Sequence, residues 1–295
     1  MEVSKKQNLI IEGRHKKPIV ADVIFKDNGE QKPVVIFCHG YKGFKDWGAW
    51  DLMGEKIAES GFFFVKFNFS HNGMSPENLT DFLNIEAFGD NNYTKELDDL
   101  QAVIDWILLP NFDFAEQIDP VKINLIGHSR AGGIVTIKAS EDKRITKLLT
   151  LASVCDFGAR FPKDDELEAW EKKGVRYITN SRTKQQLPHH YQFYKNYKQN
   201  KERLSIKRAA KSLEIPHLIV HGSSDTSVSI ADAGNLFEWS PASKLLLVEN
   251  ADHVFGTSHP WEKKELPKEF KYVLDKSLDF LKADENELIE EFSEE

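Results

Sequence analysis

Residues 123–133, INLIGHSRAGG, decide how the rest of the sequence is interpreted. A short apolar run leads directly to Ser129, which lies among small residues at the start of a helix-like stretch. Turns between strands and helices favour Gly and Ser for steric reasons alone. Ser129 is therefore either a nucleophile on a sharp turn or only the cap of a helix, and this motif by itself leaves both interpretations open.

Apolar runs alternate with amphipathic segments along most of the chain. Strand-like runs lie at residues 8–13, 19–25, 34–38, 62–69, 123–126, 147–153, 217–222 and 244–250. Helix-like patterns lie at residues 47–60, 93–108, 130–139, 201–213, 229–239 and 264–282. Because parallel strands need crossover connections, this alternation predicts an α/β fold: a mostly parallel, twisted sheet of about eight strands with helices on both faces.

Residues 155–199 interrupt the alternation, because they are dense in aromatic and charged residues and contain no run typical of a buried strand. We expect this segment to be a cap inserted after the sixth strand, over a core formed by residues 1–154 and 200–282. A plain surface excursion is the alternative. Residues 283–295 are expected to be an acidic tail, either solvated or a frayed helix end.

The composition excludes several functional classes. The chain has 295 residues, of which 40% are hydrophobic and 29% charged, and its apolar runs are far shorter than a membrane span. The net charge of -8 argues against nucleic acid as a partner. No secretory signal is recognisable at the start, so a cytoplasmic location is expected. Cys38 and Cys155 each end an apolar run and are predicted to be core residues.

A nucleophilic Ser129 needs a base and an acid, and candidates for both follow later strands. Asp225 comes just after the run at 217–222, and His253 comes just after the run at 244–250. The carboxyl ends of parallel strands share one edge, so the three side chains are expected to converge there. Asp225 as a helix cap and His253 as a loop histidine are the alternatives. The order Ser, acid, His favours a catalytic triad.

The other histidines are assigned lesser roles. His259 is a second candidate for the base, but it lies farther from the strand end than His253. His128 flanks Ser129 and is expected to shape the turn. His189 and His190 have no carboxylate or cysteine cluster at ligand spacing beside them, so no metal is expected.

These motifs resemble those of the α/β-hydrolase superfamily over nearly the whole chain. The resemblance rests on VVIFCHG at 34–40, GHSRAGG at 127–133, HGSSDTSV at 221–228 and ENADHVF at 249–255. In that family the serine lies on a nucleophile elbow whose pattern ends in Gly, and Ala131 takes that place here. The resemblance also assigns the oxyanion hole to the backbone amides of Tyr41 and Arg130.

Within the superfamily, the sequence resembles small esterases of the cinnamoyl or feruloyl and dienelactone-hydrolase-like groups. This implies a serine hydrolase that cleaves carboxylic esters of small or aromatic acyl groups through an acyl-enzyme, without a cofactor. Dienelactone hydrolases proper use a cysteine nucleophile, whereas position 129 is serine. The expected partner is a small-molecule ester, with no nucleic acid and no membrane, and a homodimer is left open.

The aromatic residues of the 155–199 segment suit an acyl or aryl group. The expected substrate contacts are His128, Phe157, Trp170 and Tyr177. Three arginines of this segment either meet a carboxylate or are ordinary surface charge: Arg160, Arg176 and Arg182.

Two other functions remain open at the level of sequence. One is a serine peptidase of the prolyl-oligopeptidase type, although 295 residues leave no room for the large propeller domain usual in that group. The other is a non-catalytic receptor for a small ligand on the same fold. An intact set of Ser129, Asp225 and His253 weighs against the receptor.

Overall fold

A computed structural model describes residues 2–180 and 182–293, and its central feature is one eight-stranded sheet. The strand order is β1 (Val3–Ile11), β2 (Ile19–Lys26), β4 (Phe63–Asn68), β3 (Lys32–Cys38), β5 (Ile118–His128), β6 (Ile145–Leu151), β9 (His217–Gly222) and β10 (Ser243–Val248). Strands β1 and β2 are antiparallel to each other, and β2 is antiparallel to β4. All other neighbouring pairs are parallel, which confirms the predicted mostly parallel sheet.

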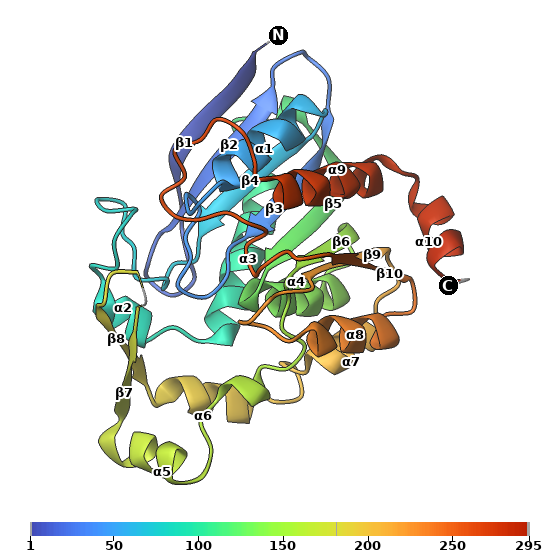
Figure 1. Cartoon of the computed structure of the whole chain (residues 1–295). Coiled ribbons are helices and arrows are strands. Elements are labelled where there is room, and N and C mark those ends of the chain that lie inside the picture. The colour runs from blue at the N-terminus through green and yellow to red at the C-terminus, as the bar shows by residue number, and fades with distance from the viewer. Residues whose placement is uncertain (1, 181, 294–295) are drawn as a thin grey trace.

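Helices cover both faces of the sheet (Figure 1). One face packs against α3 (Tyr93–Ile107), α4 (Arg130–Glu141), α7 (Ile206–Lys211) and α8 (Ile230–Trp239). The other face packs against α1 (Trp50–Glu59), α9 (Lys268–Lys282) and α10 (Glu285–Ser293). None of the helices in the described part of the chain combines the length and apolar character needed to cross a membrane.

Strand β3 illustrates why such a sheet needs helices on both sides. Val34, Ile36 and Cys38 belong to the apolar cluster beneath α3 and α4, whereas Val35 and Phe37 belong to the cluster beneath α1 and α9. Successive side chains of a strand point to opposite faces, so an unbroken apolar run can be buried only between two layers. Both cysteines, Cys38 among them, are buried and unpaired, as predicted.

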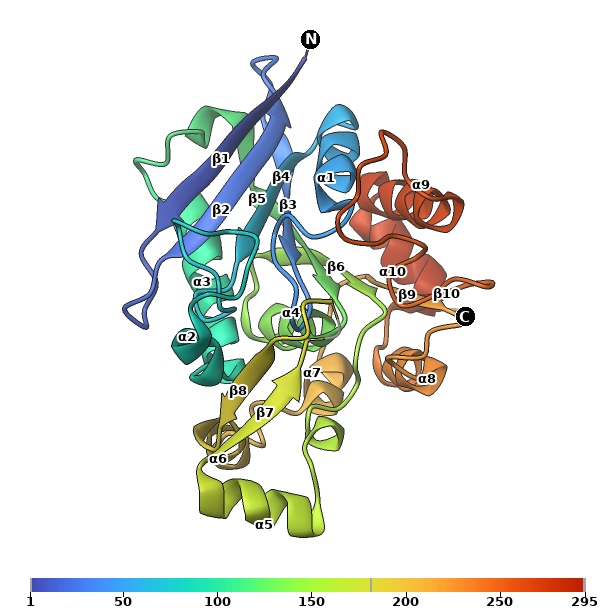
Figure 2. The ribbon, with the colours of Figure 1, turned by 60° about the vertical axis from the view of Figure 1, so that its left-hand side comes forward.

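The chain between β6 and β9 forms a separate layer at the end of the sheet where α4 begins. It contains α5 (Asp164–Lys173), a hairpin of β7 (Val175–Thr179) and β8 (Gln186–His190), and α6 (Gln192–Gln199), all before α7. Figure 2 shows these elements projecting together below the sheet. The short helix α2 (Ile85–Gly89) lies against β8.

The expectation that residues 155–199 contain no buried strand is wrong. In β8, Leu187, Pro188 and His189 are consecutive buried residues. They do not alternate with polar residues, and a proline inside a run normally argues against a strand. The sequence pattern therefore concealed this hairpin.

The expectation of a solvated or frayed tail is also wrong for residues 285–293. Leu288 and Phe292 of α10 are buried, and the ring of Phe292 stacks with Phe280 of α9 at a centroid distance of 6.1 Å. Leu288 and Phe292 are four positions apart and therefore lie on the same face of α10. The acidic residues occupy the remaining surface of the helix, and residues 294–295 lie outside the described part.

Candidate active site

Ser129 occupies the sharp turn between β5 and α4. Its backbone angles are φ 57° and ψ -120°, a conformation that L-residues rarely adopt. The turn is held by the amide of Ser129, which donates to the carbonyl of Leu151 at 2.8 Å. The Ser129 side chain makes no capping hydrogen bond to α4, so the structure does not support its reading as a helix cap.

The turn requires small neighbours. A Cβ added to Gly127 would lie 2.5 Å from the carbonyl oxygen of Ala131, and one added to Gly40 would lie 3.0 Å from Cβ of Ser129. The contact at Gly127 is with backbone and cannot be relieved by rotating a side chain, and the contact at Gly40 would require Ser129 to move. Ala131 itself is accommodated with 1% exposure, so the methyl group in place of the usual glycine is tolerated.

The structure brings Ser129, His253 and Asp225 into one hydrogen-bonded row. Oγ of Ser129 lies 3.0 Å from Nε2 of His253, and Nδ1 of His253 lies 2.7 Å from Oδ2 of Asp225. In the matching tautomer, Nδ1–H donates to Asp225 and Nε2 accepts from the serine hydroxyl. This arrangement lets the imidazole take the serine proton.

The surroundings of Asp225 keep it ionised. Burial raises the pKa of this carboxyl, but the hydrogen bond from His253 and those from the amides of Val228 and Ser227 outweigh burial and hold the pKa below its ordinary value. The helix cap of α8 is Ser229, whose side chain accepts from the amide of Ala231. Asp225 is therefore free of the capping role that the sequence left open.

The rival base, His259, is engaged elsewhere. Its Nδ1 accepts from the amide of Gly48 at 3.0 Å, and its ring packs against Phe44 and Trp47. His253 is therefore the imidazole that faces Ser129.

His128 supports the backbone of His253 rather than the turn alone. Its Nε2–H donates to the carbonyl of His253 at 2.9 Å. Burial, together with the neighbouring His253, lowers the pKa of His128 to about 3. The ring is therefore neutral near neutral pH, and it fixes the start of the loop that carries His253.

The amides of Tyr41 and Arg130 flank the serine. Arg130 is the first residue of α4, where the helix dipole favours negative charge. Throughout the described residues, no hydrogen bond engages either amide, so both N–H groups remain available as donors. The guanidinium of Arg130 also donates to the buried carboxylate of Glu96 at 3.0 Å, which anchors the side chain.

Ser129 lies at the junction of two cavities. We define the cap-side cavity, of about 410 Å³, by Phe157, Phe161, Arg176 and Phe193 together with the shared residues below. We define the loop-side cavity, of about 390 Å³, by Trp47, Trp50, Arg182 and His259 with the same shared residues. The shared residues are Tyr41, Lys42, Ser129 and His253. Both volumes fall within the range of about 300–1,000 Å³ typical of small-molecule sites.

The predicted substrate contacts divide between cavity and core. Phe157 lines the cap-side cavity and His128 lines the loop-side cavity. Trp170 lines neither, because it is 1% exposed inside the inserted layer, where its indole N–H donates to the carbonyl of His189 at 2.8 Å. Tyr177 also lines neither and is 62% exposed, because it lies on the outer side of β7. These last two residues were wrongly expected at the substrate.

Sequence reasoning missed His189 as a neighbour of the site. Nε2 of His189, in β8, lies 2.8 Å from the hydroxyl of Tyr41, a contact that spans 148 positions. Burial and nearby Arg130, Arg176 and Lys42 lower the pKa of His189 to about 2, so it is neutral and can accept from the tyrosine. No local sequence signal indicates a contact of this range.

In the structure, two carboxylates from a distant part of the sequence lie beside His190. Ligand atoms of His190, Glu86 and Asp90 lie within 4.8 Å of one another, and Nδ1 of His190 is 2.8 Å from Asp90. The carboxylates come from a segment about a hundred positions earlier, so spacing could not reveal them. The cluster lines neither cavity at Ser129.

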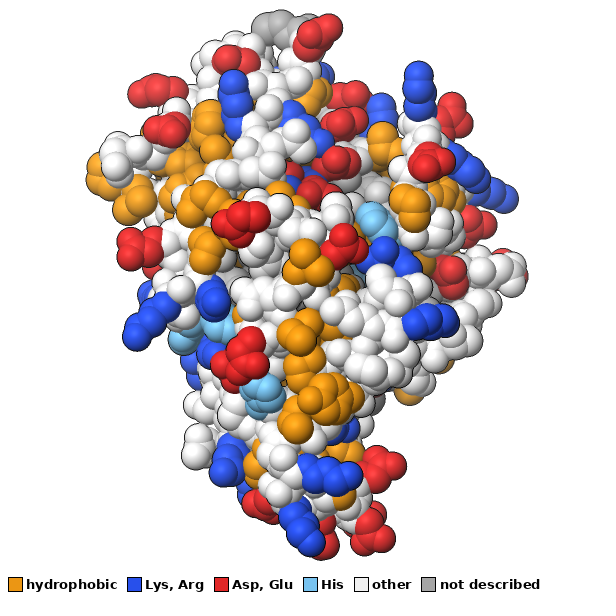
Figure 3. All heavy atoms as spheres, turned by 90° about the vertical axis from the view of Figure 1, so that its left-hand side faces the viewer, with side chains coloured by type: hydrophobic (Ala, Val, Ile, Leu, Met, Phe, Trp, Pro, Cys, Tyr) orange, Lys and Arg blue, Asp and Glu red, His pale blue; other side chains and the backbone are white. Residues whose placement is uncertain are grey.

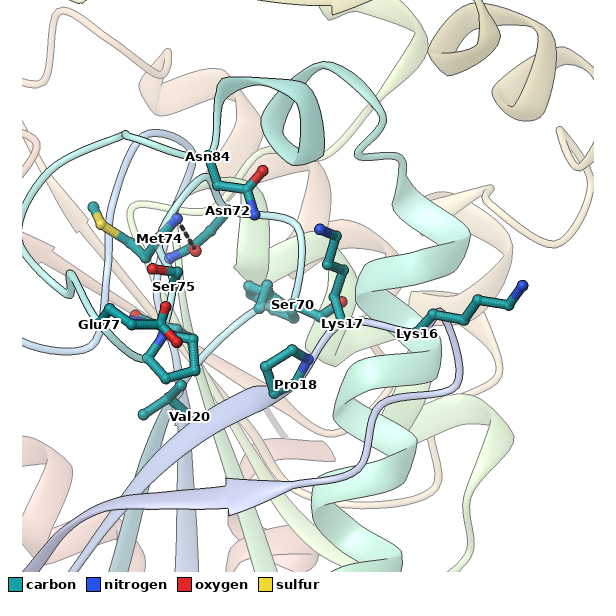
Figure 4. Close-up of a pocket in the computed structure, with 13 residues that line it drawn as sticks. Lys16, Lys17, Pro18, Val20, Ser70, Asn72, Met74, Ser75, Glu77 and Asn84 are labelled. Carbon is teal, nitrogen blue, oxygen red and sulfur yellow. Dashed lines mark hydrogen bonds between the residues drawn. The ribbon is translucent and has the colours of Figure 1, made fainter.

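A further hollow of about 280 Å³ lies between the start of β2 and the loop after β4 (Figure 4). Lys17 and Glu77 are among its lining residues, and Oδ1 of Asn72 accepts from the amide of Met74 at 3.0 Å. No member of the Ser129, His253 and Asp225 row lines it, so it lies outside the candidate active site.

Comparisons with known proteins agree with this architecture. A family model described as the alpha/beta hydrolase fold matches residues 33–175. The structure is similar to that of Est1E from Butyrivibrio proteoclasticus with bound ferulic acid (TM-score 0.69, 18% identity, covering 92% of this chain and 97% of that one). It is also similar to a putative hydrolase from Agrobacterium vitis (TM-score 0.70, 18% identity, 96% and 100% covered).

A putative dienelactone hydrolase from Klebsiella pneumoniae is similar as well, with a TM-score of 0.61, 13% identity, and coverage of 95% of this chain and 99% of that one. A comparison with curated protein sequences finds no match. At such low identities, the likeness establishes the fold, and any reaction must be argued from the site itself.

Proposed function

Because this chain has the α/β-hydrolase fold, we propose that it is a serine hydrolase that cleaves carboxylic esters through an acyl-enzyme. The catalytic residues in this proposal are Ser129, His253 and Asp225. The observation that carries it is their continuous row of contacts, 3.0 Å from serine to imidazole and 2.7 Å from imidazole to carboxylate. The row ends between two cavities large enough for the two halves of an ester.

In the first step, Nε2 of His253 takes the hydroxyl proton of Ser129 while Oγ attacks the ester carbonyl carbon. Asp225 holds the ring in the tautomer that can accept this proton, and its negative charge stabilises the imidazolium that forms. The imidazolium then returns the proton to the departing alkoxide. The C–O bond to the alcohol breaks, and an ester bond to Ser129 remains.

The tetrahedral intermediate carries its negative charge on the former carbonyl oxygen. In the proposal, the amides of Tyr41 and Arg130 donate to this oxygen, and the N-terminus of α4 adds a favourable dipole. Donors fixed in advance need no reorganisation when the charge develops. Mutations that remove one such donor in other hydrolases typically cost about 10²–10³ in kcat.

Water completes the cycle. His253 takes a proton from a water molecule, the hydroxide attacks the acyl-enzyme carbonyl, and the same amides stabilise the second intermediate. The imidazolium then protonates Oγ of Ser129 as the carboxylic acid leaves, which restores the resting site. This sequence of steps needs no cofactor.

Residues 155–199 act in this proposal as the cap that shapes the acyl site. Phe157, Phe161 and Phe193 line the cap-side cavity, and such rings offer apolar contact area to small or aromatic acyl groups. The solved relative with ferulic acid bound gives independent support for an aromatic acyl group. Its low identity to this chain makes that support one of analogy.

The test is hydrolysis of p-nitrophenyl esters of increasing acyl length and of methyl ferulate by the wild type and Ser129→Ala. Ester turnover that disappears in Ser129→Ala supports the proposal. A matched control is Ser224→Ala, because Ser224 is an exposed serine that follows β9 at the same sheet edge. This control is expected to retain the full rate.

Two outcomes would replace the proposal. Faster cleavage of an aminoacyl-p-nitroanilide than of any ester would identify a peptidase. Tight binding of ferulate by the folded wild type without any turnover would identify a receptor on this fold.

A further inference from the structure

We infer that the substrate carries a carboxylate in addition to its ester, and that Arg176 and Lys42 bind this carboxylate in the cap-side cavity. The inference rests on the proposed function, which identifies the bond that is cleaved beside Ser129. It adds a substrate class to that function: half-esters of dicarboxylic acids, or esters of acids with a second acidic group.

The cap-side cavity is lined by four cationic side chains and by no Asp or Glu. Two of the cations already have acidic partners: Arg130 lies 3.0 Å from Glu96, and Arg160 lies 2.9 Å from Asp232. The other two are Lys42 and Arg176, and among the described residues neither has a carboxylate within salt-bridge distance. The cavity therefore holds an excess of positive charge.

This excess contrasts with the rest of the molecule. The chain has a net charge of -8, and acidic and basic side chains are interspersed over the face seen in Figure 3. Two cations without an ion-pair partner in one cavity beside a candidate nucleophile are therefore a local feature, although Glu166, which does not line the cavity, also acts on the charge of Arg176. Such a pair attracts substrates of the opposite charge.

Two buried donors at the same cavity lack hydrogen-bond partners. They are Nε of Arg176 and Nδ1 of His189, and His189 is only 5% exposed. Because Nε2 of His189 accepts from Tyr41, the proton of this neutral ring resides on Nδ1. Buried donors without acceptors are costly to the fold, and an oxygen-rich ligand group would satisfy them.

Arg176 is held in a fixed orientation that suits this task. Its guanidinium lies 4.6 Å from the centre of the ring of the buried Trp170. Burial lowers the pKa of Lys42, and nearby Arg130 lowers it further. An anion bound in this cavity would stabilise the charged form of Lys42 and would offer an acceptor to Arg176.

The remaining lining favours a carboxylate over a phosphate. Apolar side chains of Val154, Phe157, Ile178 and Phe193 form much of the cavity wall. A planar guanidinium matches a carboxylate with two parallel hydrogen bonds, whereas a doubly charged phosphate normally gathers more donors than this wall offers. The ligand is therefore an organic acid with an apolar carbon body.

The test compares two esters of equal chain length, mono-p-nitrophenyl glutarate and p-nitrophenyl valerate. We expect the wild type to prefer the glutarate ester in kcat/KM, and the ratio to fall about ten- to hundredfold in Arg176→Met, as loss of a charge-assisted hydrogen bond predicts. Lys42→Met should lower the ratio as well, and Arg176→Lys should recover part of it. Added salt should reduce the preference.

The matched control is Lys172→Met, which removes an exposed cation of α5 that does not line the cavity. It should leave the ratio unchanged. The inference would be overturned if the wild type had the same kcat/KM for both esters and Arg176→Met changed both values by the same factor. The proposal of a serine hydrolase would still hold in that case.

A second readout does not need turnover. Calorimetry on Ser129→Ala should show that glutarate binds more tightly than butyrate. This difference in affinity should disappear in the double variant that carries both Ser129→Ala and Arg176→Met. If this binding holds but the wild type hydrolyses neither ester, the proposed function fails and the carboxylate site stands. Tighter binding of inorganic phosphate than of glutarate would overturn the carboxylate assignment.

Discussion

The guanidinium carbon of Arg130 lies 4.1 Å from the centre of the Tyr41 ring. The two residues proposed to supply the oxyanion-hole amides therefore also contact each other through their side chains. Glu96 holds the far side of Arg130, and His189 holds the hydroxyl of Tyr41. The loop after β3, the start of α4 and the hairpin of β7 and β8 are thereby joined at one point beside Ser129.

This junction predicts different effects for two variants of Tyr41. Tyr41→Phe loses the bond to His189 but keeps the ring beneath Arg130, and should cost about 0.5–1.5 kcal/mol of unfolding free energy. Tyr41→Ala loses the ring as well and should lower kcat at least about tenfold, because the amide of residue 41 is no longer held in place. Steady-state kinetics and urea titrations separate the effects. Equal kcat for Tyr41→Ala and wild type would contradict the role of the junction.

Replacement of the carboxylate that orients His253 should damage catalysis without damaging the fold. Asp225→Asn offers an amide N–H to Nδ1 of His253 and so favours the tautomer whose Nε2 is protonated. That tautomer cannot accept from Ser129, and kcat should fall by about 10⁴. Asp156→Asn, at an exposed carboxylate after β6, is the control and should retain the wild-type rate. A loss below about tenfold in Asp225→Asn would exclude the triad.

Gly40 should not tolerate even one methyl group. The added Cβ would meet Cβ of Ser129 at 3.0 Å and the carbonyl oxygen of His128 at 3.1 Å. Gly40→Ala should therefore displace the serine and reduce ester turnover by about 10² or more, since small misplacements of reacting groups are costly. The control is Gly234→Ala in α8, where nothing lies within 4 Å of the added atom. Helix propensity predicts that this control gains up to about 1 kcal/mol of stability.

Asp99 of α3 should make stability depend on pH. Burial raises the pKa of Asp99 to about 7, and the nearby carboxylates Glu96 and Asp98 also raise it. The hydrogen bonds from Ser70 lower this pKa but do not outweigh burial. The unfolded chain loses this proton near pH 4, so the folded state is penalised progressively between about pH 4 and 7, by up to about 4 kcal/mol. Above pH 7 the penalty is constant.

Asp99→Asn removes the titrating group and should gain stability relative to wild type as pH rises from 5 to 8. Urea titrations at a series of pH values measure this difference. The control is Asp113→Asn, at an exposed loop position, which should change the unfolding free energy by less than about 0.5 kcal/mol. A pH-independent difference for Asp99→Asn would mean that Asp99 is not protonated in the fold.

The parts of the structure predicted from sequence are those that depend on local patterns. Apolar runs gave the strands of the main sheet, and the residues that follow them, Ser129, Asp225 and His253, share one edge because parallel strands end together. Ala131 takes the place of the usual glycine at this turn and is buried there.

The parts that escaped prediction depend on contacts between distant segments. Trp170 of α5 is buried inside the inserted layer, whereas Tyr177 of β7 is exposed on its outside, and a two-stranded hairpin hidden by Pro188 gave no pattern from which to predict this layer. The bond between Tyr41 and His189 joins residues 148 positions apart. Such pairings are fixed by packing, which a single sequence does not encode in any short spacing.

The position of the inserted layer has a consequence for how such a protein can diverge. Strands β6 and β9 are parallel neighbours, and α7 alone is enough to carry the chain across the sheet between them. Residues 155–199 are thus topologically dispensable, although they supply Arg176, Phe157 and His189 to the serine's surroundings. A lineage can therefore exchange this one stretch and acquire a new range of ligands, while the sheet and the three side chains proposed to be catalytic are inherited unchanged.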